Sequence, residues 1–472
     1  MKKLRPKLLW RRLRQTSSET KLGVVVSFLL AFGFRPSYEF VVGTSNIQLS
    51  VGLLAFVLTA VIIGLIFVKT AAYKHILPVL PILFFLAMQM LFQWNGPRSG
   101  LLFLLWVAIV VLAASRMFNK KFVRGFIYGL FLAAIFSVAL GVLQIALDSF
   151  GIRLWLSPEY TGDVFGFARA QGLFEEPQFL ASFLILPLFA SLIIRPKYWR
   201  LIFMVCVFGV TITMSRGAAV AMLTGTLSYL WLSRSTDLLK TAYATSAAII
   251  LGLIVVGATG YVRSDYNTGP TYFQKNYLQH MLGQEIDNKL VVRKYAVNPK
   301  TSQKASGQIS SAGSRVSTAK EGWELVTRDR NWFFYGHGLS GYDAYKTDQL
   351  GTTGSGKGYT VNNMYLETWL ELGLIGLSML FAWTIGVIGR LIKLAKKQDI
   401  LALALTVMLV AGSTQQLFFS SLVNNLHYWL LLILATSYVD KNNAPDLRSK
   451  PKQNRLSPPK RLARKTASRD TQ

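Results

Sequence analysis

Residues 49–68, "LSVGLLAFVLTAVIIGLIFV", contain no charged side chain and decide the class of this chain. A helix that spans a membrane needs about 20 predominantly apolar residues, and this run has that length. Only 15% of the 472 residues are charged, whereas soluble proteins carry about 25%. Length alone would suggest about three soluble domains. The apolar run instead predicts an all-α polytopic integral membrane protein.

Hydrophobic run length predicts about twelve transmembrane helices along the chain. The predicted segments are 22–42, 49–69, 76–94, 99–115, 125–148, 177–195, 200–214, 217–233, 241–261, 364–388, 399–421 and 424–439. The first segment is interrupted by Arg35 and Glu39, and such charges are rare within spanning helices.

The distribution of lysine and arginine predicts which side of the membrane each loop faces. Strongly basic short loops read "KTAAYK", "RMFNKKFVR", "RPKYWR" and "RLIKLAKK". They alternate along the chain with less basic loops such as "NGPRSG" and "LVNN". With both termini in the cytoplasm, every strongly basic short loop falls on the cytoplasmic side, and an odd number of spans would break this alternation.

The net charge of +29 is concentrated at the two ends of the chain and in short loops. On a soluble protein it would suggest a nucleic-acid partner. Here the clusters at 1–14 and 448–469 instead favour cytoplasmic retention and contact with anionic membrane lipids, with no nucleic acid bound. The single cysteine, Cys206, excludes an intrachain disulfide. The four histidines are scattered, so no metal site and no cofactor are predicted.

Two segments predicted to lie outside the cell are long, and they define the domain organisation. The parts are a basic cytoplasmic N-terminus (1–21), transmembrane helices 1–9 with an outer loop at 149–176 (22–261), a large extracytoplasmic loop (262–361), transmembrane helices 10–12 (362–439) and a basic cytoplasmic tail predicted to be disordered (440–472). Outer loops of this size in a compact membrane protein are usually functional.

Three patterns follow one another in the large loop before the third-last helix. The stretch at 298–314 is polar and of low complexity, which predicts mobility. At 315–334 an amphipathic helix on the outer leaflet is expected. Its apolar positions recur at helical spacing and are Val316, Ala319, Trp323, Val326 and Thr327. The sequence "YGHGLSGYDAY" at 335–345 is then expected to turn on its glycines.

The stretch "GTTGSGKG" at 351–358 nearly matches the phosphate-binding pattern GxxxxGK[ST]. Gly358 stands where a hydroxyl should hold magnesium, and no strand is expected before the loop. The predicted topology also puts this loop outside the cell, away from ATP. A flexible glycine loop is therefore favoured over a nucleotide site, and in such a loop Lys357 could still touch an anionic substrate.

Charged residues gather near the predicted outer surface. Arg169 precedes a span, Arg216 lies at a tight link between two spans, and Arg315 begins the expected amphipathic helix. Arginine binds phosphate oxygens bidentately and stays charged, so several arginines there suit a diphosphate. Each arginine also has an alternative role that involves no substrate. Arg216 would cap a hairpin or snorkel to lipid head groups, and Arg169 and Arg315 would be solvated loop charges.

Acids and one histidine lie near these arginines in the sequence. Asn363, Glu367 and Glu371 are spaced i, i+4, i+8 and share one helix face. An ionised group inside the membrane costs about 2.5–3.5 kcal/mol, so this face is expected to point into the bundle. The two acids either orient the arginines or serve as structural ion-pair partners. His337 between two glycines is either a turn residue or a base.

Four stretches together resemble the O-antigen ligase and polymerase superfamily of bacterial envelope proteins. They are "RAQGLFEEPQFLA", "SRGAAVAM", "RVSTAKEGWELVTRDRNWFFYGHGLSGY" and "NNMYLETWLELGLIGL". The resemblance covers roughly residues 50–435. It implies metal-independent inverting glycosyl transfer from undecaprenyl diphosphate at the outer face of the bacterial plasma (inner) membrane. It also implies a lipid-linked oligosaccharide substrate, with a chain-length regulator and a flippase as partners.

By position within these motifs, the resemblance makes Arg216 and Arg315 candidate diphosphate clamps and Arg169 a candidate substrate contact. Asn362 and Asn363 are expected to cap the following helix. That helix end also offers a partial positive charge to an anion, so both residues and Glu367 count among the substrate-binding candidates.

One departure separates polymerase from ligase. Ligases of this superfamily usually have His-Asn where this chain has Asn362-Asn363, and that histidine is taken to activate the acceptor. The "EEP" element at Glu175-Glu176-Pro177 resembles the polysaccharide polymerases more. Polymerisation is therefore favoured over ligation to an acceptor such as lipid A core. Glu175, Glu176 and His337 are the candidate catalytic bases, and the choice among them stays open.

Two further functional classes compete with an enzyme. Buried arginine and glutamate would also suit a secondary anion transporter, but no inverted repeat of broken helices is evident. A non-catalytic assembly or export partner is the other alternative. Loss of a polymerase should make the cell accumulate single lipid-linked repeat units, whereas loss of a transporter should not.

Overall fold

The computed structural model of the protein describes most of the chain. The described residues are 17–33, 38–42, 45–49, 79–93, 95, 97–116, 118–150, 154–156, 168–233, 238–262, 311–349, 361–418 and 426–443. The predicted span at 49–69 beyond Leu49, most of the polar stretch at 298–314, the glycine loop at 351–358 and most of both basic tails lie outside the described residues.

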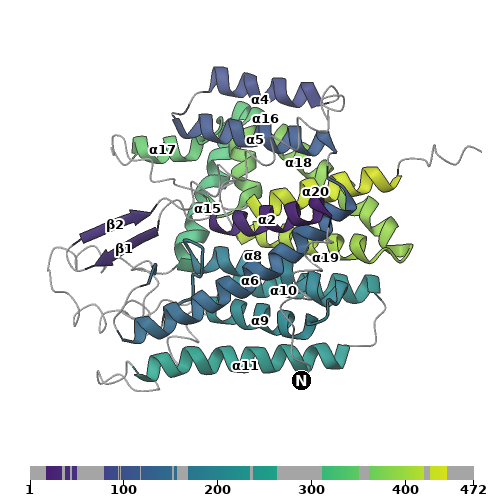
Figure 1. Cartoon of the computed structure of the whole chain (residues 1–472). Helices are drawn as coiled ribbons and strands as arrows, with labels where there is room; N and C mark the ends of the chain where they lie inside the picture. Colours follow the sequence, from purple (N-terminus) through teal and green to yellow (C-terminus); the bar gives the residue numbers. More distant parts are fainter. Residues whose placement is uncertain are drawn as a thin grey trace, which may run out of the picture.

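The described chain consists of helices with a single β-hairpin (Figure 1). The elements are α2 (Ser18–Gly33), β1 (Tyr38–Val42), β2 (Ser45–Leu49), α4 (Leu80–Phe92), α5 (Pro97–Ser115), α6 (Lys120–Ser149), α8 (Pro177–Ile194), α9 (Trp199–Thr213), α10 (Arg216–Ser233), α11 (Leu238–Val262), α15 (Ser311–Arg328), α16 (Arg330–Tyr335), α17 (Gly341–Gln349), α18 (Met364–Lys396), α19 (Ile400–Gln415), the 3-10 turn η5 (Gln416–Phe418) and α20 (Leu426–Asn443).

Helices occupy the predicted segments from 76 to 261 and from 364 to 439, with most ends within a few residues of the prediction. Four stretches are long and apolar enough to cross a membrane, namely Lys120–Asp148, Pro177–Ile194, Met364–Lys396 and Ile400–Phe418. Shorter apolar helices lie in α4, α5, α9 and α11. A helical membrane protein is therefore confirmed, and the count of twelve spans stays a prediction.

The first predicted span, 22–42, is wrong at residues 38–42, which form a β-strand instead of a helix, and this hairpin is the one exception to the helical fold among the described residues. β1 and β2 pair as an antiparallel hairpin in which Tyr38 faces Leu49 and Val42 faces Ser45. Arg35 and Glu39 interrupt the apolar run in the sequence. The β-branched residues Val41 and Val42 favour a strand.

Helix α8 lies at the centre of the bundle and is buried along nearly its whole length. It contacts α6, α9, α10 and α19, which explains why its sequence is apolar on every face. Small residues allow close packing elsewhere: a Cβ added to Gly23, Gly125 or Gly129 would overlap the facing helix of the α2–α6 pair. Close backbone approach at such residues is typical of helices within membranes.

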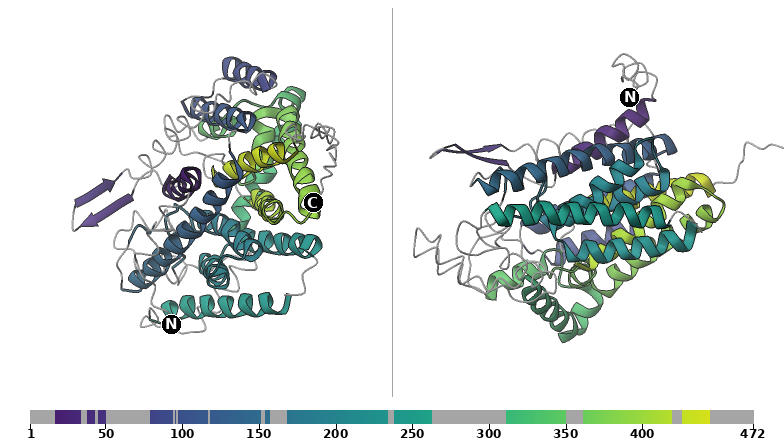
Figure 2. Two further views of the ribbon diagram at one scale, coloured as in Figure 1. Left: turned by 45° about the vertical axis from the view of Figure 1, so that its right-hand side comes forward. Right: turned by 90° about the horizontal axis from the view of Figure 1, so that it is seen from below.

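The axes of most helices are roughly parallel to one another, whatever the chain direction (Figure 2). The bundle therefore has two distinct ends. At the α15 end, α8, α10 and α18 begin and α19 ends, with α15 and α17 beside them (left in Figure 1). At the Asp440 end, Thr20 of α2 donates a hydrogen bond to the Lys121 carbonyl, and Asp440 of α20 pairs with Arg116 just before α6. The start of α2 and the end of α20 therefore lie at the same end of the bundle, and the side of a membrane that this end faces stays a prediction.

The predicted amphipathic helix is present but shorter than expected, and its apolar face is divided. α15 ends at Arg328, and α16 follows with Asp329 as its N-cap, which accepts from the Asn331 N–H at 2.6 Å. Val326 is fully buried, whereas Val316 and Trp323 are 69% and 52% exposed. Part of the face therefore packs on α18 instead of facing lipid, and the position on an outer leaflet stays a prediction.

Candidate functional site

The site begins with the cap of α18. The Asn363 side chain accepts from the backbone N–H groups of Tyr365 and Leu366, each at 3.1 Å. Asn362 lies in the left-handed region at φ 56°, and its Nδ2 donates to Thr318 Oγ1 of α15 at 3.5 Å. The predicted cap is therefore confirmed for Asn363, while Asn362 ties the start of α18 to α15.

Helix α18 is broken at Gly373, shortly after its predicted entry into the membrane. This glycine has φ 68° and ψ −174°, a conformation that strains any residue with a side chain. A Cβ there would also overlap the carbonyl oxygen of Phe334 in α16. The residues from Met364 to the break thus pack with α15 and α16, and the continuous part of the helix starts after Gly373.

The break exposes two carbonyl groups, and the predicted glycine turn supplies their donors. The His337 N–H donates to the Leu370 carbonyl at 2.6 Å, and the Gly338 N–H donates to the Glu371 carbonyl at 3.1 Å. Gly336 and Gly338 adopt φ values of 79° and 83°, which confirms that the stretch turns on its glycines. Buried backbone groups must be paired, so this turn and the break in α18 depend on each other.

The two acids of α18 are buried, as their shared face predicted. Glu367 is 8% exposed and Glu371 is 6% exposed. One carboxylate oxygen of Glu371 accepts from the Ser340 N–H at 2.9 Å, immediately before α17 begins. A negative charge is stabilised at a helix N-terminus, so Glu371 holds α17 against α18. The role of both acids in orienting arginines stays a prediction.

Hydrogen bonds from Arg169 join the loop before α8 to the link between α9 and α10, and we call this connection the Arg169 strap. Its Nε donates to the Thr213 carbonyl at 3.0 Å, and its Nη2 lies 3.5 Å from the Met214 carbonyl. The next residue extends the strap, because the Ala170 N–H donates to the Ile212 carbonyl at 3.2 Å. Arg169 is buried, so the alternative of a solvated loop charge is wrong for it.

Arg216 opens α10 at the tight link that the sequence predicted. α9 ends at Thr213, and Met214 turns the chain at φ 54°. A Cβ added to Gly217 would come within 2.8 Å of the Phe418 side chain, so the start of α10 lies against the end of α19. α10 also contacts α18, so Arg216 opens a helix that packs against both α18 and α19.

Position 315 lies on the face of α15 that meets the start of α18. Thr318, one turn later, contacts Asn362, and Gly322 packs so closely that a Cβ would lie 2.8 Å from Val361. Residues three and seven positions apart share one helix face. The side chain of Arg315 is outside the described part of the structure, so its convergence with Arg216 stays a prediction.

His337 is half-buried and packs against an aromatic ring. Its imidazole centroid lies 4.2 Å from that of Trp332, and its carbonyl accepts from Asn95 Nδ2 at 3.0 Å. Burial lowers the pKa of His337 below its usual 6.5, so the ring is neutral at pH 7. A neutral imidazole can accept a proton, but the lowered pKa makes it a weak base.

The "EEP" element leads from the Arg169 strap into α8. Glu175 is exposed, and its carbonyl accepts from Gln171 Nε2 at 2.5 Å. Glu176 occupies the N-cap position of α8 with Pro177 directly after it, a favoured place for proline. The Glu176 carboxylate bonds to the Gln178 amide. Glu175 is thus the more accessible of the two candidate acids.

One buried polar group at this end was missed by the sequence reasoning. Gln415 closes α19 and is 1% exposed, and neither atom of its amide group has a partner among the described residues. Two residues earlier, the Ser413 carbonyl accepts from Tyr365 Oη of α18 at 2.8 Å. The polar run "STQQ" at the end of an apolar segment was the available signal. No group of three or more potential metal ligands occurs among the described residues.

Residues 201–381 match the model of a family described as O-antigen ligase. This region, less than half of the chain, is similar to O-antigen ligases. The match confirms the resemblance to the O-antigen ligase and polymerase superfamily and supports a membrane enzyme of the glycosyltransferase type. No curated protein matches the chain.

The matched region contains most of the candidate site. It runs from α9 into the middle of α18 and includes Arg216, Arg315, His337, the Asn362-Asn363 pair and Glu367. Arg169, Glu175 and Glu176 lie before it in the sequence, and the Arg169 strap is what joins them to it.

Proposed function

We propose that the protein polymerises oligosaccharide repeat units, carried on undecaprenyl diphosphate, into a cell-surface polysaccharide at the outer face of the plasma membrane. The observation that carries this proposal is that α18 contacts both α15 and α10 and that all three helices begin inside the region that matches the O-antigen ligase family. The capped start of α18 meets α15 at Thr318, one turn from position 315, and α10 begins with Arg216.

In the proposed reaction the arginines act on the leaving group. The acceptor hydroxyl attacks the anomeric carbon of the donor from the face opposite the diphosphate, which inverts the configuration. A new carbon–oxygen bond forms as the bond between the anomeric carbon and the phosphate oxygen breaks. The leaving diphosphate gains negative charge in the transition state, and guanidinium groups that bind it more tightly there accelerate the step.

The hydroxyl proton needs an acceptor, and the candidates differ in their surroundings. His337 is neutral at pH 7 and held by its turn, but burial lowers its pKa. Glu175 is exposed at the end of the strap, where a sugar hydroxyl has access. Glu176 is engaged with Gln178. This accessibility favours Glu175 as the base that receives the proton.

The proposal is tested with purified protein and a defined undecaprenyl-diphosphate repeat unit as the sole substrate. Polymerisation predicts lipid-linked dimers and longer products. Arg216→Lys keeps the charge but loses the planar fork, and we expect product formation to fall by about 10²–10³ with a normal protein level. Arg200→Lys, at an exposed position at the other end of the bundle, is the matched control. Unchanged yield and chain length in Arg216→Lys would argue against the clamp.

Ligation to another acceptor is the second candidate, and it is equally compatible with the family match. The chain has Asn362 where ligases of the superfamily usually have histidine, and Asn362 contacts Thr318 instead. The same assay separates the two functions. A ligase would form product only when an acceptor such as lipid A core is added, whereas a polymerase would need the repeat unit alone.

A further inference from the structure

A cavity of about 350 Å³ lies between α4, α5, α18 and α20, on the side of the bundle away from α8. Its walls are mostly apolar and include Phe85, Trp106 and Leu380. Leu372 lines it just before the break in α18, and along the continuous part of that helix it extends from Gly376 to Arg390. At 1.5 Å per residue this length is about 21 Å, more than the roughly 15 Å of hydrocarbon in one leaflet.

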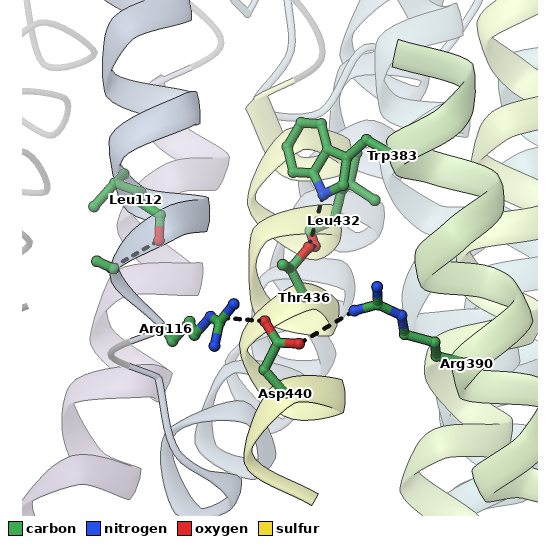
Figure 3. A network of polar contacts seen from close by, with 8 residues as sticks. Leu112, Arg116, Trp383, Arg390, Leu432, Thr436 and Asp440 are labelled. Atoms are coloured by element: carbon green, nitrogen blue, oxygen red, sulfur yellow. Dashed lines mark hydrogen bonds and ion pairs between the residues drawn. The ribbon is translucent and has the colours of Figure 1, made fainter. Parts of the chain in front are cut away.

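The Asp440 end of the cavity is charged, as Figure 3 shows. Arg116 Nε lies 3.0 Å from one carboxylate oxygen of Asp440, and Arg390 Nη1 lies 3.3 Å from the other. The arginine side chains are 49% and 59% exposed, whereas that of Asp440 is 13% exposed. Two cations therefore share one anion, and each guanidinium has five N–H groups, so donors remain open at the mouth.

The lining is mostly apolar, which suits hydrocarbon, although Trp106 Nε1 is buried without a hydrogen-bond partner among the described residues. Trp383 Nε1 donates to Thr436 Oγ1 at 3.0 Å, and that hydroxyl donates in turn to the Leu432 carbonyl at 2.8 Å (Figure 3). Met379 lines the cavity and is 39% exposed, so the cavity opens on the bundle surface.

Further positive charge surrounds the mouth. Lys393, Lys396 and Lys397 follow Arg390 at the end of α18 and are exposed. Basic residues next to a membrane-spanning segment attract anionic lipids, and the arginine fork matches phosphate oxygens. The combination of an apolar channel and a phosphate-binding mouth fits an amphiphile with a phosphate head.

We propose that this cavity binds one anionic phospholipid from the leaflet at the Asp440 end. An acyl chain lies between α4 and α18, and the headgroup phosphate contacts Arg116 and Arg390. The site lies at the opposite end of the bundle from Arg216 and does not depend on the reaction proposed above. Asp440 keeps the two guanidiniums in place when no lipid is bound.

The test compares lipid retention among variants of the full chain in nanodiscs containing dioleoyl phosphatidylglycerol and dioleoyl phosphatidylcholine. Native mass spectrometry after transfer to detergent should find phosphatidylglycerol on the unmodified protein. The triple variant Arg116→Gln/Arg390→Gln/Asp440→Asn replaces the charged network by neutral groups of similar shape. We expect it to retain at least about tenfold less phosphatidylglycerol.

Three further variants separate binding from a structural role. Asp440→Asn frees both arginines and should increase the retention of phosphatidylglycerol. If the network were purely structural, Asp440→Asn and the triple variant would both retain less phosphatidylglycerol than the unmodified protein. Ala114→Phe narrows the cavity, which Ala114 lines, and should lower retention with the arginines intact. Lys393→Gln/Lys397→Gln removes two nearby charges outside the cavity and should change retention much less than the triple variant does.

Three results would overturn the proposal. One is equal retention of both lipids by the unmodified protein, and another is full retention of phosphatidylglycerol by the triple variant. The third is occupation by the apolar segment at 51–69. In that case no lipid would be retained, and a cysteine at Met379 would crosslink to cysteines introduced along 55–66 after Cys206→Ser.

Discussion

The two ends of the bundle hold charge in different ways. At the α15 end, Arg169 and Glu371 are buried, and their described hydrogen bonds join them to backbone carbonyl and N–H groups. At the Asp440 end, Arg116 and Arg390 are half exposed and bond the side chain of Asp440. A buried charge needs fixed partners because its desolvation is costly, whereas an exposed pair contributes little. The α15 end is thus a rigid frame, and the Asp440 end can exchange its partners for a ligand.

The largest expected effect comes from removing the break in α18. Gly373→Ala introduces a Cβ at φ 68° that overlaps the Phe334 carbonyl oxygen, and we expect destabilisation of about 3 kcal/mol or more. Gly386→Ala in the same helix has nothing within 4 Å of the added Cβ and should stabilise by up to about 1 kcal/mol. Thermal unfolding of the two purified variants measures the difference, and equal shifts would contradict the rigid-frame interpretation.

The Arg169 strap provides the next test. Arg169→Met leaves the Thr213 carbonyl without this donor, which should cost about 1–3 kcal/mol and lower the unfolding temperature. Arg216→Lys should reduce product and leave the unfolding temperature unchanged. If Arg169→Met abolished product without any loss of stability, Arg169 would be a direct substrate contact instead of a strap.

The glycine turn should make stability depend on pH through His337. Burial lowers its pKa below 6.5 in the folded protein, so between that lowered value and about 6.5 the unfolded chain binds more protons. This contribution is fully present above about pH 6.5 and is lost as pH falls toward the folded pKa. Unfolding temperatures of the unmodified protein and of His337→Gln, measured between about pH 7.5 and 5, should diverge in that window. Parallel curves would show that His337 is not the titrating group.

The smallest effect is expected at the Asp440 end. Arg390→Gln removes one exposed partner of Asp440 while Arg116 remains paired to it, so stability should change by less than about 1 kcal/mol. Thermal unfolding is again the measurement. A loss as large as that of Gly373→Ala would remove the contrast between the two ends.

Local patterns were predicted well from the sequence. The helix positions followed from apolar run length, and the Asn363 cap and the turn at Gly336 and Gly338 followed from residues next to them in the chain. The break at Gly373 could not be predicted in this way, because it depends on the Phe334 carbonyl and on donors from the turn at His337. Each of those partners is distant from Gly373 in the sequence and reaches it only through folding.

The sequence predicted which residues belong to the candidate site, but it did not predict which groups each of them contacts. Arg169 was expected beside the substrate, and its described hydrogen bonds hold the link before Arg216. Glu371 was expected to orient arginines, and it bonds the start of α17. Gln415 was missed because a glutamine at the end of an apolar helix carries no distinctive spacing.

The sequence by itself determined that the protein is helical and apolar enough for a membrane, and which stretches resemble the O-antigen ligase and polymerase superfamily. These properties depend on composition and short-range order, which a linear chain displays directly. Only the tertiary structure decided which charges are bound by the backbone and which remain available to a ligand. Burial and the partner of a charge are set by helices far apart in the chain, so their geometry exists only after the bundle has formed.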